Sequence, residues 1–400
     1  MNKFYGLALA LISALTLLSQ SRIAIALKPE QVNGIAREIT VLIPSEDDGA
    51  EGIVRQNGSG VIIAREGNNY TVLTASHVLC KDYEVNCKNY YYELQVVTHD
   101  GKKYSLNPNS IRKLPEIDLV VFQFTSDRDY RLATLANYEL ADEQFIFASG
   151  WPDPKFVGKR ERFFNVGKVL PKAISPLFKI FPPSFGYELI YTSVTYGGMS
   201  GGPVLDTEGR VIGIHGQNEG EKIKEVRVAI GFSLAIPITT FLKLAPQSGI
   251  QGQINVENSP PNALSFQEIG DELYKAFEVP NKNDTNPLNW LNQGNKMWRL
   301  GQLALAYAAY EKALQLDAQL YQAWYGKGLV LTYWKRPQEA LAAYEQALKI
   351  NPNSNTAKKL RDNLQQSLGG RNTPPVTPSQ PTTAPTVEPS PQPSNPRRLW

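Results

Sequence analysis

The sequence contains few histidines and cysteines, the residues that most often bind zinc. Its 400 residues include only three histidines and two cysteines, and their spacing matches no zinc site. An excess of charge of one sign is also missing. The sequence has 41 Lys and Arg and 38 Asp and Glu, which gives a formal net charge of +3. That balance argues against nucleic acid or an anionic membrane as the main partner. We therefore expect no metal, no cofactor and no nucleic-acid ligand.

Long hydrophobic runs are missing after the N-terminus. Gly6–Leu18 is apolar and follows the basic Lys3, but it is too short to span a bilayer comfortably. Ala24-Ile25-Ala26 fits a signal-peptidase site, so residues 1–26 are predicted to be a signal peptide, with an uncleaved anchor as the alternative. The mature protein should then be soluble and exported, either periplasmic or secreted, with no stable membrane insertion.

The two cysteines, Cys80 and Cys87, lie in one polar segment. In an oxidising compartment such a pair is expected to form a local disulfide, and two free thiols are the alternative.

Residues 27–245 have the pattern of an all-β domain, and a chain of 400 residues has room for at least one more. Short runs rich in Val, Ile, Tyr and Phe alternate with Gly, Asn, Asp and Pro. This pattern favours a double β-barrel over a β-sandwich. The runs are Gly60–Ala64, Tyr70–Leu73, Tyr92–Thr98, Leu119–Phe124, Glu143–Ala148, Gly167–Leu170, Leu189–Ser193, Pro203–Leu205, Val211–Ile214 and Val228–Ser233.

The pattern changes after residue 245. Residues 246–264 read as a polar linker, and residues 265–369 as an all-α domain that begins with a helix over Ser265–Glu278. Residues 370–400 are rich in Pro, Thr and Ser and are predicted to be a disordered tail.

An internal repeat of 34 residues lies within the helical region, and it aligns residues 287–320 with residues 321–354. The matched pairs are Trp290 with Trp324, Gly294 with Gly328, Ala306 with Ala340, Tyr310 with Tyr344, and Ala313 with Ala347. These residues resemble the tetratricopeptide repeat, which implies helix pairs whose concave surface binds a protein partner. Flanking helices are expected to cap the two repeats.

Three motifs point to acyl-transfer chemistry. Gly197 to Val204 reads Gly-Gly-Met-Ser-Gly-Gly-Pro-Val, a glycine-rich turn that can expose Ser200 and direct backbone N–H groups at an oxyanion. Thr74-Ala75-Ser76-His77 follows one strand-like run, and Asp118-Leu119-Val120-Val121 begins another. The order His77, Asp118, Ser200 is that of the chymotrypsin-type triad.

These motifs resemble those of trypsin-like serine peptidases, over about residues 30–245, and are closer to the bacterial glutamyl endopeptidases and HtrA proteases than to the pancreatic enzymes. The resemblance implies that His77 is the general base, that Asp118 orients it and that Ser200 is the nucleophile. The N–H groups of Gly198 and Ser200 would form the oxyanion hole. Asp82 and Asp100 compete with Asp118 for its role.

Residues near Ser200 bear on which substrate residue would precede the cleaved bond. Val194 replaces the aspartate of trypsin-like specificity, and Met199 cannot pair with a freed N-terminus as the corresponding pancreatic aspartate does. Thr195 and His215 stand at the two spacings that line the substrate pocket of glutamyl endopeptidases, so the resemblance implies cleavage after Glu or Asp. A hydroxyl and an imidazole can both donate to a carboxylate.

The sequence thus predicts an exported serine endopeptidase that acts on proteins or peptides and binds a protein partner through its repeats. The alternative is a non-catalytic scaffold that acts through the repeats alone.

We predict that Cys80 and Cys87 are linked in the exported protein, which in the chain-entropy model would stabilise the fold by about 2.5 kcal/mol. Mass spectrometry of the non-reduced protein should find the two peptides joined. Complete alkylation of both thiols without reductant would contradict the bridge.

Overall fold

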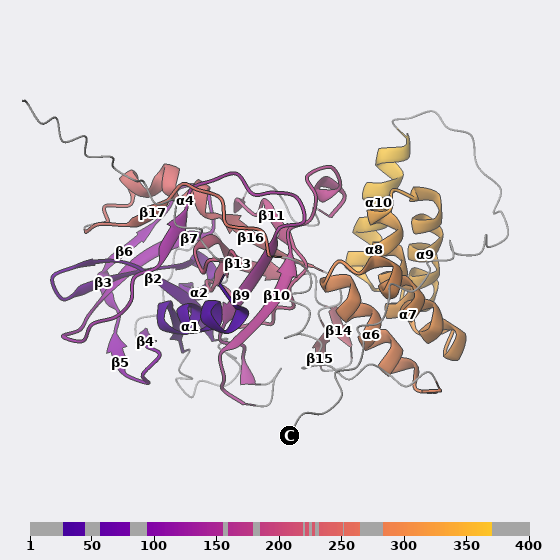
Figure 1. Cartoon of the computed structure of the whole chain (residues 1–400), viewed down its shortest axis with the longest axis horizontal. Coiled ribbons are helices and arrows are strands. Elements are labelled where there is room, and N and C mark those ends of the chain that lie inside the picture. The colour runs from indigo at the N-terminus through magenta and orange to yellow at the C-terminus, as the bar shows by residue number, and fades with distance from the viewer. Residues whose placement is uncertain are drawn as a thin grey trace, which may run out of the picture.

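The computed structural model describes residues 27–44, 57–80, 94–154, 159–178, 185–218, 221–223, 226–228, 232–250, 252–264 and 283–369. A strand-rich part is followed by a stack of helices (Figure 1). The predicted signal peptide, Cys87, the helix at 265–278 and the tail at 370–400 lie outside these ranges. The disulfide therefore stays a prediction, although Cys80 itself is fully buried at the end of a short helix.

The first sheet has seven strands in the order β5-β4-β1-β2-β3-β7-β6. Alternating Val, Ile, Tyr and Phe side chains give it a core of its own, which includes Tyr70, Phe122 and Phe124. Helix α1 (Pro29–Ile39) precedes it, and α2 (Ser76–Leu79) follows β3. The strands are β1 (Thr40–Ile43), β2 (Gly58–Glu66), β3 (Asn69–Ala75), β4 (Gln95–Val97), β5 (Lys103–Ser105), β6 (Asn107–Lys113) and β7 (Leu119–Thr125).

The second sheet has eight strands, with the path β10-β9-β12-β13-β16-β11 and with β8 and β17 beside it. A bridge between Val169 and Tyr191 joins the β10 end to the β11 end, so the sheet closes on itself. The strands are β8 (Thr134–Ala136), β9 (Phe145–Gly150), β10 (Phe163–Lys168), β11 (Leu189–Tyr191), β12 (Pro203–Leu205), β13 (Val211–Asn218), β16 (Ser233–Pro237) and β17 (Asn255–Glu257). Two barrel-like sheets confirm the predicted fold class.

Smaller elements complete the strand-rich part. The hairpin β14 (Glu221–Ile223) and β15 (Val226–Val228) forms a separate two-stranded sheet. The short helices are η1 (Ser175–Phe178), α4 (Ile238–Leu244) and η3 (Ala245–Gln247).

The segment predicted as a linker is instead partly built into the second sheet. Its β17 pairs in parallel with β8, and Arg210 donates from Nη1 to Ser259 O at 2.7 Å. The same arginine forms an ion pair with the fully buried Asp206 at 2.7 Å. The sequence hid this strand because all three of its side chains are exposed, so no apolar alternation marks it.

The helices follow the predicted repeat. They are α6 (Pro287–Arg299), α7 (Leu303–Leu316), α8 (Tyr321–Tyr333), α9 (Pro337–Ile350) and α10 (Asn355–Gly369). Gly294 and Gly328 lie against the rings of Tyr310 and Tyr344, where an added Cβ would come within 2.5 Å of a ring carbon. The small residues therefore allow the close helix packing that the repeat pattern predicted.

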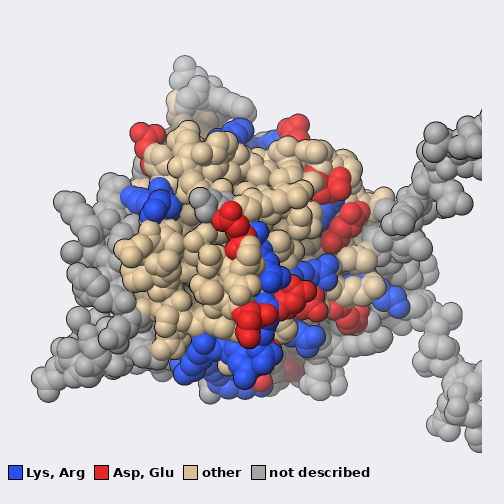
Figure 2. All heavy atoms as spheres, turned by 90° about the vertical axis from the view of Figure 1, so that its left-hand side faces the viewer, with Lys and Arg blue, Asp and Glu red and all other residues tan. Residues whose placement is uncertain are grey.

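Acidic and basic side chains lie next to one another on the end of the molecule that carries β3 and β6 (Figure 2). This mixture is what the near balance of charge in the sequence predicts. Across the described ranges, no helix has the length and hydropathy needed to cross a membrane.

Candidate active site

His77 and Asp118 meet where two neighbouring strands end. β3 and β7 are antiparallel partners, with Ala75 opposite Leu119, so the residues just beyond this register face each other. His77 Nδ1 lies 2.6 Å from Asp118 Oδ2, and the His77 backbone N–H donates to Asp118 Oδ1 at 3.0 Å. The two bonds fix both the ring and the main chain of the histidine, and they leave Nε2 for a further partner.

The Asp118 carboxylate has a second side-chain donor that the sequence did not indicate. The Tyr187 hydroxyl donates to Asp118 Oδ2 at 2.5 Å. Burial raises the pKa of Asp118, but the charge of His77 and the hydrogen bonds from His77 and Tyr187 outweigh it, so the pKa lies below its usual value. Burial, followed by the adjacent carboxylate, raises the pKa of Tyr187 well above its usual value. Asp118 is therefore an ionised acceptor and Tyr187 a protonated donor.

Gly216 makes room for that tyrosine. A Cβ at position 216 would lie 2.1 Å from the Tyr187 hydroxyl oxygen and 2.5 Å from a ring carbon. Any larger residue at this point of β13 would push the hydroxyl away from Asp118.

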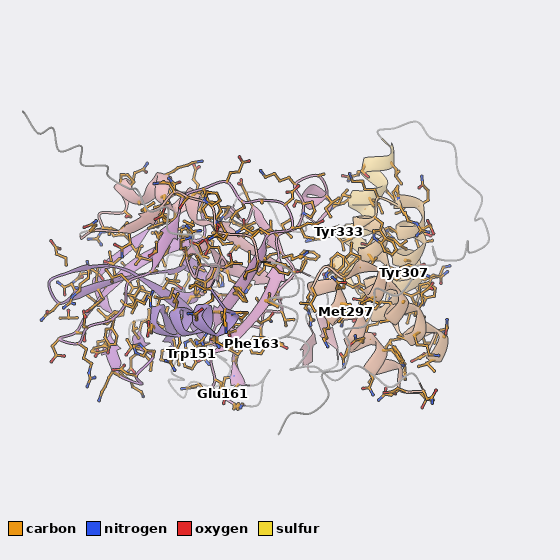
Figure 3. The ribbon with its side chains drawn as sticks, viewed as in Figure 1. Trp151, Glu161, Phe163, Met297, Tyr307 and Tyr333 are labelled. Atoms are coloured by element: carbon orange, nitrogen blue, oxygen red, sulfur yellow. The ribbon has the colours of Figure 1, made fainter. Side chains whose placement is uncertain are left out.

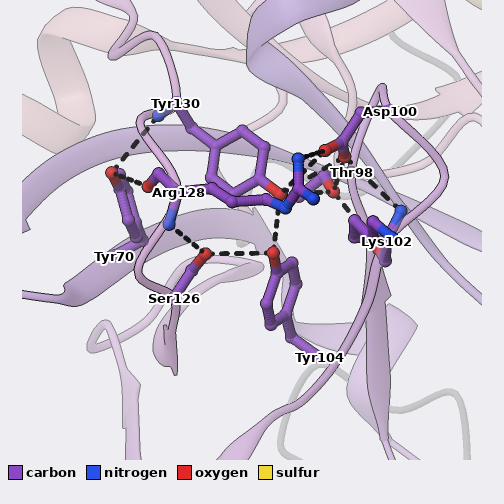
Figure 4. A network of polar contacts seen from close by, with 8 residues as sticks. All are labelled: Tyr70, Thr98, Asp100, Lys102, Tyr104, Ser126, Arg128 and Tyr130. Atoms are coloured by element: carbon purple, nitrogen blue, oxygen red, sulfur yellow. Dashed lines mark hydrogen bonds and ion pairs between the residues drawn. The ribbon is translucent and has the colours of Figure 1, made fainter.

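Asp100, which the sequence left as a competitor for the role of Asp118, belongs to a different site. It accepts from Thr98 Oγ1 at 2.6 Å and pairs with Arg128 at 3.3 Å, within a network that includes Tyr130 and Tyr104 (Figure 4). This network ties the β4–β5 turn to the chain after β7. The other competitor, Asp82, lies outside the described residues.

The turn that carries Ser200 is held by Ser59 of β2. The Ser59 N–H donates to Ser200 O at 2.8 Å, and its hydroxyl donates to Gly198 O at 2.9 Å. That hydroxyl also accepts from the Trp151 N–H at 2.8 Å, and Ser59 O accepts from Thr74 Oγ1 at 2.6 Å. One buried serine of the first sheet therefore links the Ser200 turn to β3, the strand just before His77.

Two backbone N–H groups of this turn remain available to a ligand. Gly198 has φ of 99°, in the region that favours glycine, and a Cβ there would lie 2.6 Å from Trp151 O. Within the part of the chain that the structure describes, neither the Gly198 nor the Ser200 N–H donates to a protein acceptor, whereas those of Met199 and Gly201 do. Two such donors close to a serine can stabilise an oxyanion.

The Ser200 hydroxyl donates to Gly216 O at 3.1 Å. The Gly201 N–H donates to His215 O at 2.7 Å, so the serine turn and β13 are directly joined. A transfer of the hydroxyl proton to His77 would require the Ser200 side chain to turn from this carbonyl toward Nε2. The bond given up is a neutral one, worth about 1 kcal/mol.

Thr195 and His215 lie on adjoining segments, because Asn218 of β13 donates to Thr195 O at 3.1 Å. Both side chains are buried. Thr195 Oγ1 lies 2.7 Å from Ser233 Oγ, which itself donates to Ser193 O at 2.9 Å, so the threonine hydroxyl is the donor to Ser233. His215 Nδ1 lies 2.7 Å from the Tyr191 hydroxyl. Each side chain thus contacts a supporting residue rather than the other.

Burial, together with the charge of His77 and against a smaller opposing effect of a backbone hydrogen bond with Leu234, lowers the pKa of His215 to about 3. The imidazole is therefore neutral at physiological pH. Burial raises the pKa of Tyr191 well above its usual value, so its hydroxyl is protonated and can donate to Nδ1. In that arrangement Nε2 carries the proton of His215.

Two contributors to the site, Tyr187 and Ser59, escaped the sequence analysis. Ser59 stands between Gly58 and Gly60, a local signal that could have been noticed. Tyr187 carries no such signal, since it lies 69 positions from Asp118 and only the fold brings it there.

Comparison with known families agrees with this geometry. Residues 58–214 match the trypsin-like peptidase domain, and residues 290–320 and 321–354 each match the tetratricopeptide repeat. The peptidase match contains His77, Asp118 and Ser200 and ends just before His215. No curated protein matches the chain. The chain therefore carries a trypsin-like peptidase domain and two tetratricopeptide repeats.

We predict that Tyr187→Phe lowers kcat for peptide cleavage about 10- to 100-fold with little change in KM. The variant removes one hydrogen bond to an ionised group, typically worth about 1.5–3 kcal/mol, and leaves the substrate surface intact. Gly216→Ala should act in the same direction by displacing the hydroxyl.

Tyr138→Phe is the matched control, because the Tyr138 hydroxyl also donates to a buried carboxylate, that of Asp206, at 3.0 Å. It should reduce the free energy of unfolding and leave kcat unchanged. Equal losses of kcat in the Tyr187 and Tyr138 variants would contradict a specific role for Tyr187.

Proposed function

We propose that this chain, with its trypsin-like peptidase domain and its repeats, is a serine endopeptidase whose triad is His77, Asp118 and Ser200. The observation that carries the proposal is the bond of 2.6 Å between His77 Nδ1 and the buried Asp118. It holds the tautomer in which Nε2 can accept a proton. A histidine that merely ended a strand would need no such partner.

The first half of the reaction forms an acyl-enzyme. Ser200 Oγ attacks the scissile carbonyl while His77 Nε2 takes its proton, and the imidazolium is stabilised by Asp118. His77 then gives the proton to the leaving amine. In the second half, water attacks the acyl group by the same route and restores the serine.

The charge that develops on the carbonyl oxygen is placed against the N–H groups of Gly198 and Ser200. Ser59 supports both donors, since it binds the carbonyl oxygens of the same two residues. Donors fixed before the reaction need no reorganisation as the charge forms, and one such donor is worth about 3 kcal/mol in the transition state.

We further propose that the enzyme prefers Glu or Asp before the cut, as in the glutamyl endopeptidase branch of the family. Support comes from His215, which lies on a segment adjoining that of Thr195 and carries an N–H on Nε2 for a substrate carboxylate. The Thr195 hydroxyl gives its proton to Ser233, so His215 is the donor on which the proposed preference rests. A neutral His215 offers one N–H, and a bound carboxylate would favour its protonation. Val194 offers no charge to a Lys or Arg substrate.

Export belongs to the same proposal and rests on the N-terminal sequence, which has the regions of a signal peptide. The repeats supply surface for a protein partner, as repeats of this kind do in general.

Ser200→Ala should abolish labelling by a fluorophosphonate probe and lower peptide turnover by several orders of magnitude, since the nucleophile is lost while the fold is kept. The probe also discriminates the scaffold alternative, because a non-catalytic domain would not react. Labelling of the alanine variant at the rate of the unmodified protein would refute the assignment.

The acidic preference is tested with peptides that differ only before the cut, with Glu, Asp, Gln, Leu or Lys. His215→Val should reduce cleavage after Glu by about one to two orders of magnitude, because a hydrogen bond to a charged group is lost, and cleavage after Leu much less.

His99→Val serves as the control, since His99 lies exposed in the β4–β5 turn. It should leave the preference unchanged. If Leu or Lys is the best residue for the unmodified enzyme, the acidic pocket is wrong and the peptidase assignment stands.

A further inference from the structure

The first helices of the repeats face the peptidase domain. In Figure 1, α6, α8 and α10 lie on the side of the strands, and α7 and α9 lie beyond them. Figure 3 shows Tyr333, at the end of α8, at the junction of the two parts, with Tyr307 of α7 farther out. In a stack of such repeats the first helices are expected to line the concave surface. The protein's own peptidase domain therefore lies where an outside ligand would bind.

Each of these three helices, the first helices of the two repeats and the flanking α10, makes a hydrogen bond to the second sheet or its loops. For α6, the carbonyl of its last residue, Arg299, accepts from Thr192 Oγ1 at 2.8 Å. For α8, the Tyr333 hydroxyl donates to Glu143 Oε1 at 2.5 Å. For α10, Asn363 Nδ2 donates to Leu177 O in η1 at 3.1 Å. The contacts span the whole stack rather than one corner of it.

Apolar packing continues across the same junction. One cluster of buried side chains includes Phe145 and Val166 of the second sheet together with Trp298, Leu329 and Leu360 of the three helices. Trp298 is 1% exposed, whereas Leu305 on α7 is 51% exposed. Trp298 also lies edge-on to the ring of Tyr333, with 6.0 Å between the ring centres, so α6 and α8 bring aromatic side chains to the same place.

Lys168, the last residue of β10, adds a third kind of contact. The Lys168 side chain lies against Gly301, just after α6. A Cβ added to Gly301 would lie 3.0 Å from this side chain. Its ammonium lies 4.6 Å from the centre of the Phe145 ring and 4.0 Å from Glu143, the acceptor of Tyr333. The Lys168 ammonium thus interacts with groups inside the junction and not with solvent alone.

The junction leads directly to the candidate specificity residues. Thr192 makes two hydrogen bonds to Lys168 at the end of β10. Its N–H donates to Lys168 O at 3.0 Å, and its Oγ1 accepts from Lys168 N at 2.9 Å. The next residues along the chain run to Thr195. Asn165 of β10 holds this segment too, through a bond of 2.8 Å to Val194 O.

We propose that the face formed by α6, α8 and α10 is the docking surface for the chain's own peptidase domain, and that it braces the segment 192–195. A second protein that binds this face must displace the peptidase domain and thereby release that segment. A partner that binds without displacing the peptidase domain must use the opposite side of the stack, formed by α7 and α9, where Leu305 is exposed.

Hydrogen exchange of the full chain tests the proposal without any need for catalysis. The double variant Tyr333→Phe/Asn363→Ala removes two of the three interdomain hydrogen bonds described above. Amides at the β10–β11 junction, residues 168–170 and 190–192, should then exchange about tenfold faster. Amides of β3 in the first sheet should not change.

The control is Tyr307→Phe/Asn353→Ala, which makes the same two kinds of substitution in the repeats away from the junction. It should leave exchange at residues 168–170 and 190–192 unchanged. Unchanged exchange there in the test variant overturns the proposal, and so does an equal increase in the control. The first outcome counts even if circular dichroism shows that the test variant has lost helix, because a brace that has unfolded can no longer protect the segment.

Discussion

The contact between Ser59 and the Ser200 turn is the constraint on which the rest of the site depends. The two sheets carry different members of the proposed triad, with His77 and Asp118 at the edge of the first and Ser200 in the turn before β12 of the second. Ser59 belongs to the first sheet and binds the main chain of Gly198 and Ser200 through both its N–H and its hydroxyl. Serine suits this position because it is small enough to lie between the sheets and can both donate and accept.

A low-dielectric interior strengthens the polar contacts where the two sheets meet. Asp118 and His215 are both buried, and each has a tyrosine hydroxyl against it, from Tyr187 and Tyr191 respectively. A buried group without a partner would cost several kcal/mol. The tyrosines supply that partner, and their raised pKa values keep them as donors. Burial keeps His215 neutral, whereas Asp118 stays charged despite its burial because His77 and Tyr187 stabilise the carboxylate; both states suit the proposed roles.

The helical repeats are joined to the peptidase domain by apolar packing and hydrogen bonds. Their first helices share a continuous apolar core with the second sheet, and Thr192 links α6 to the segment that leads to Thr195. The repeats are therefore packed against the peptidase domain and contact the segment that precedes Thr195. The physical cause is the burial of apolar side chains from both parts in one cluster.

Local pattern in the sequence determined the strand-rich and helical halves, the spacing of the repeats, and the motifs around His77, Asp118 and Ser200. Strand alternation, helix period and glycine-rich turns are properties of neighbouring residues, so the sequence alone can reveal them. The roles assigned to those motifs remain predictions. Tertiary structure alone decided that Asp118 rather than Asp100 meets His77, that Tyr187 supports the carboxylate, that β17 joins the second sheet and that the repeats face the peptidase domain. Each of these depends on which distant segments pack together, and such contacts leave no periodic trace in the chain.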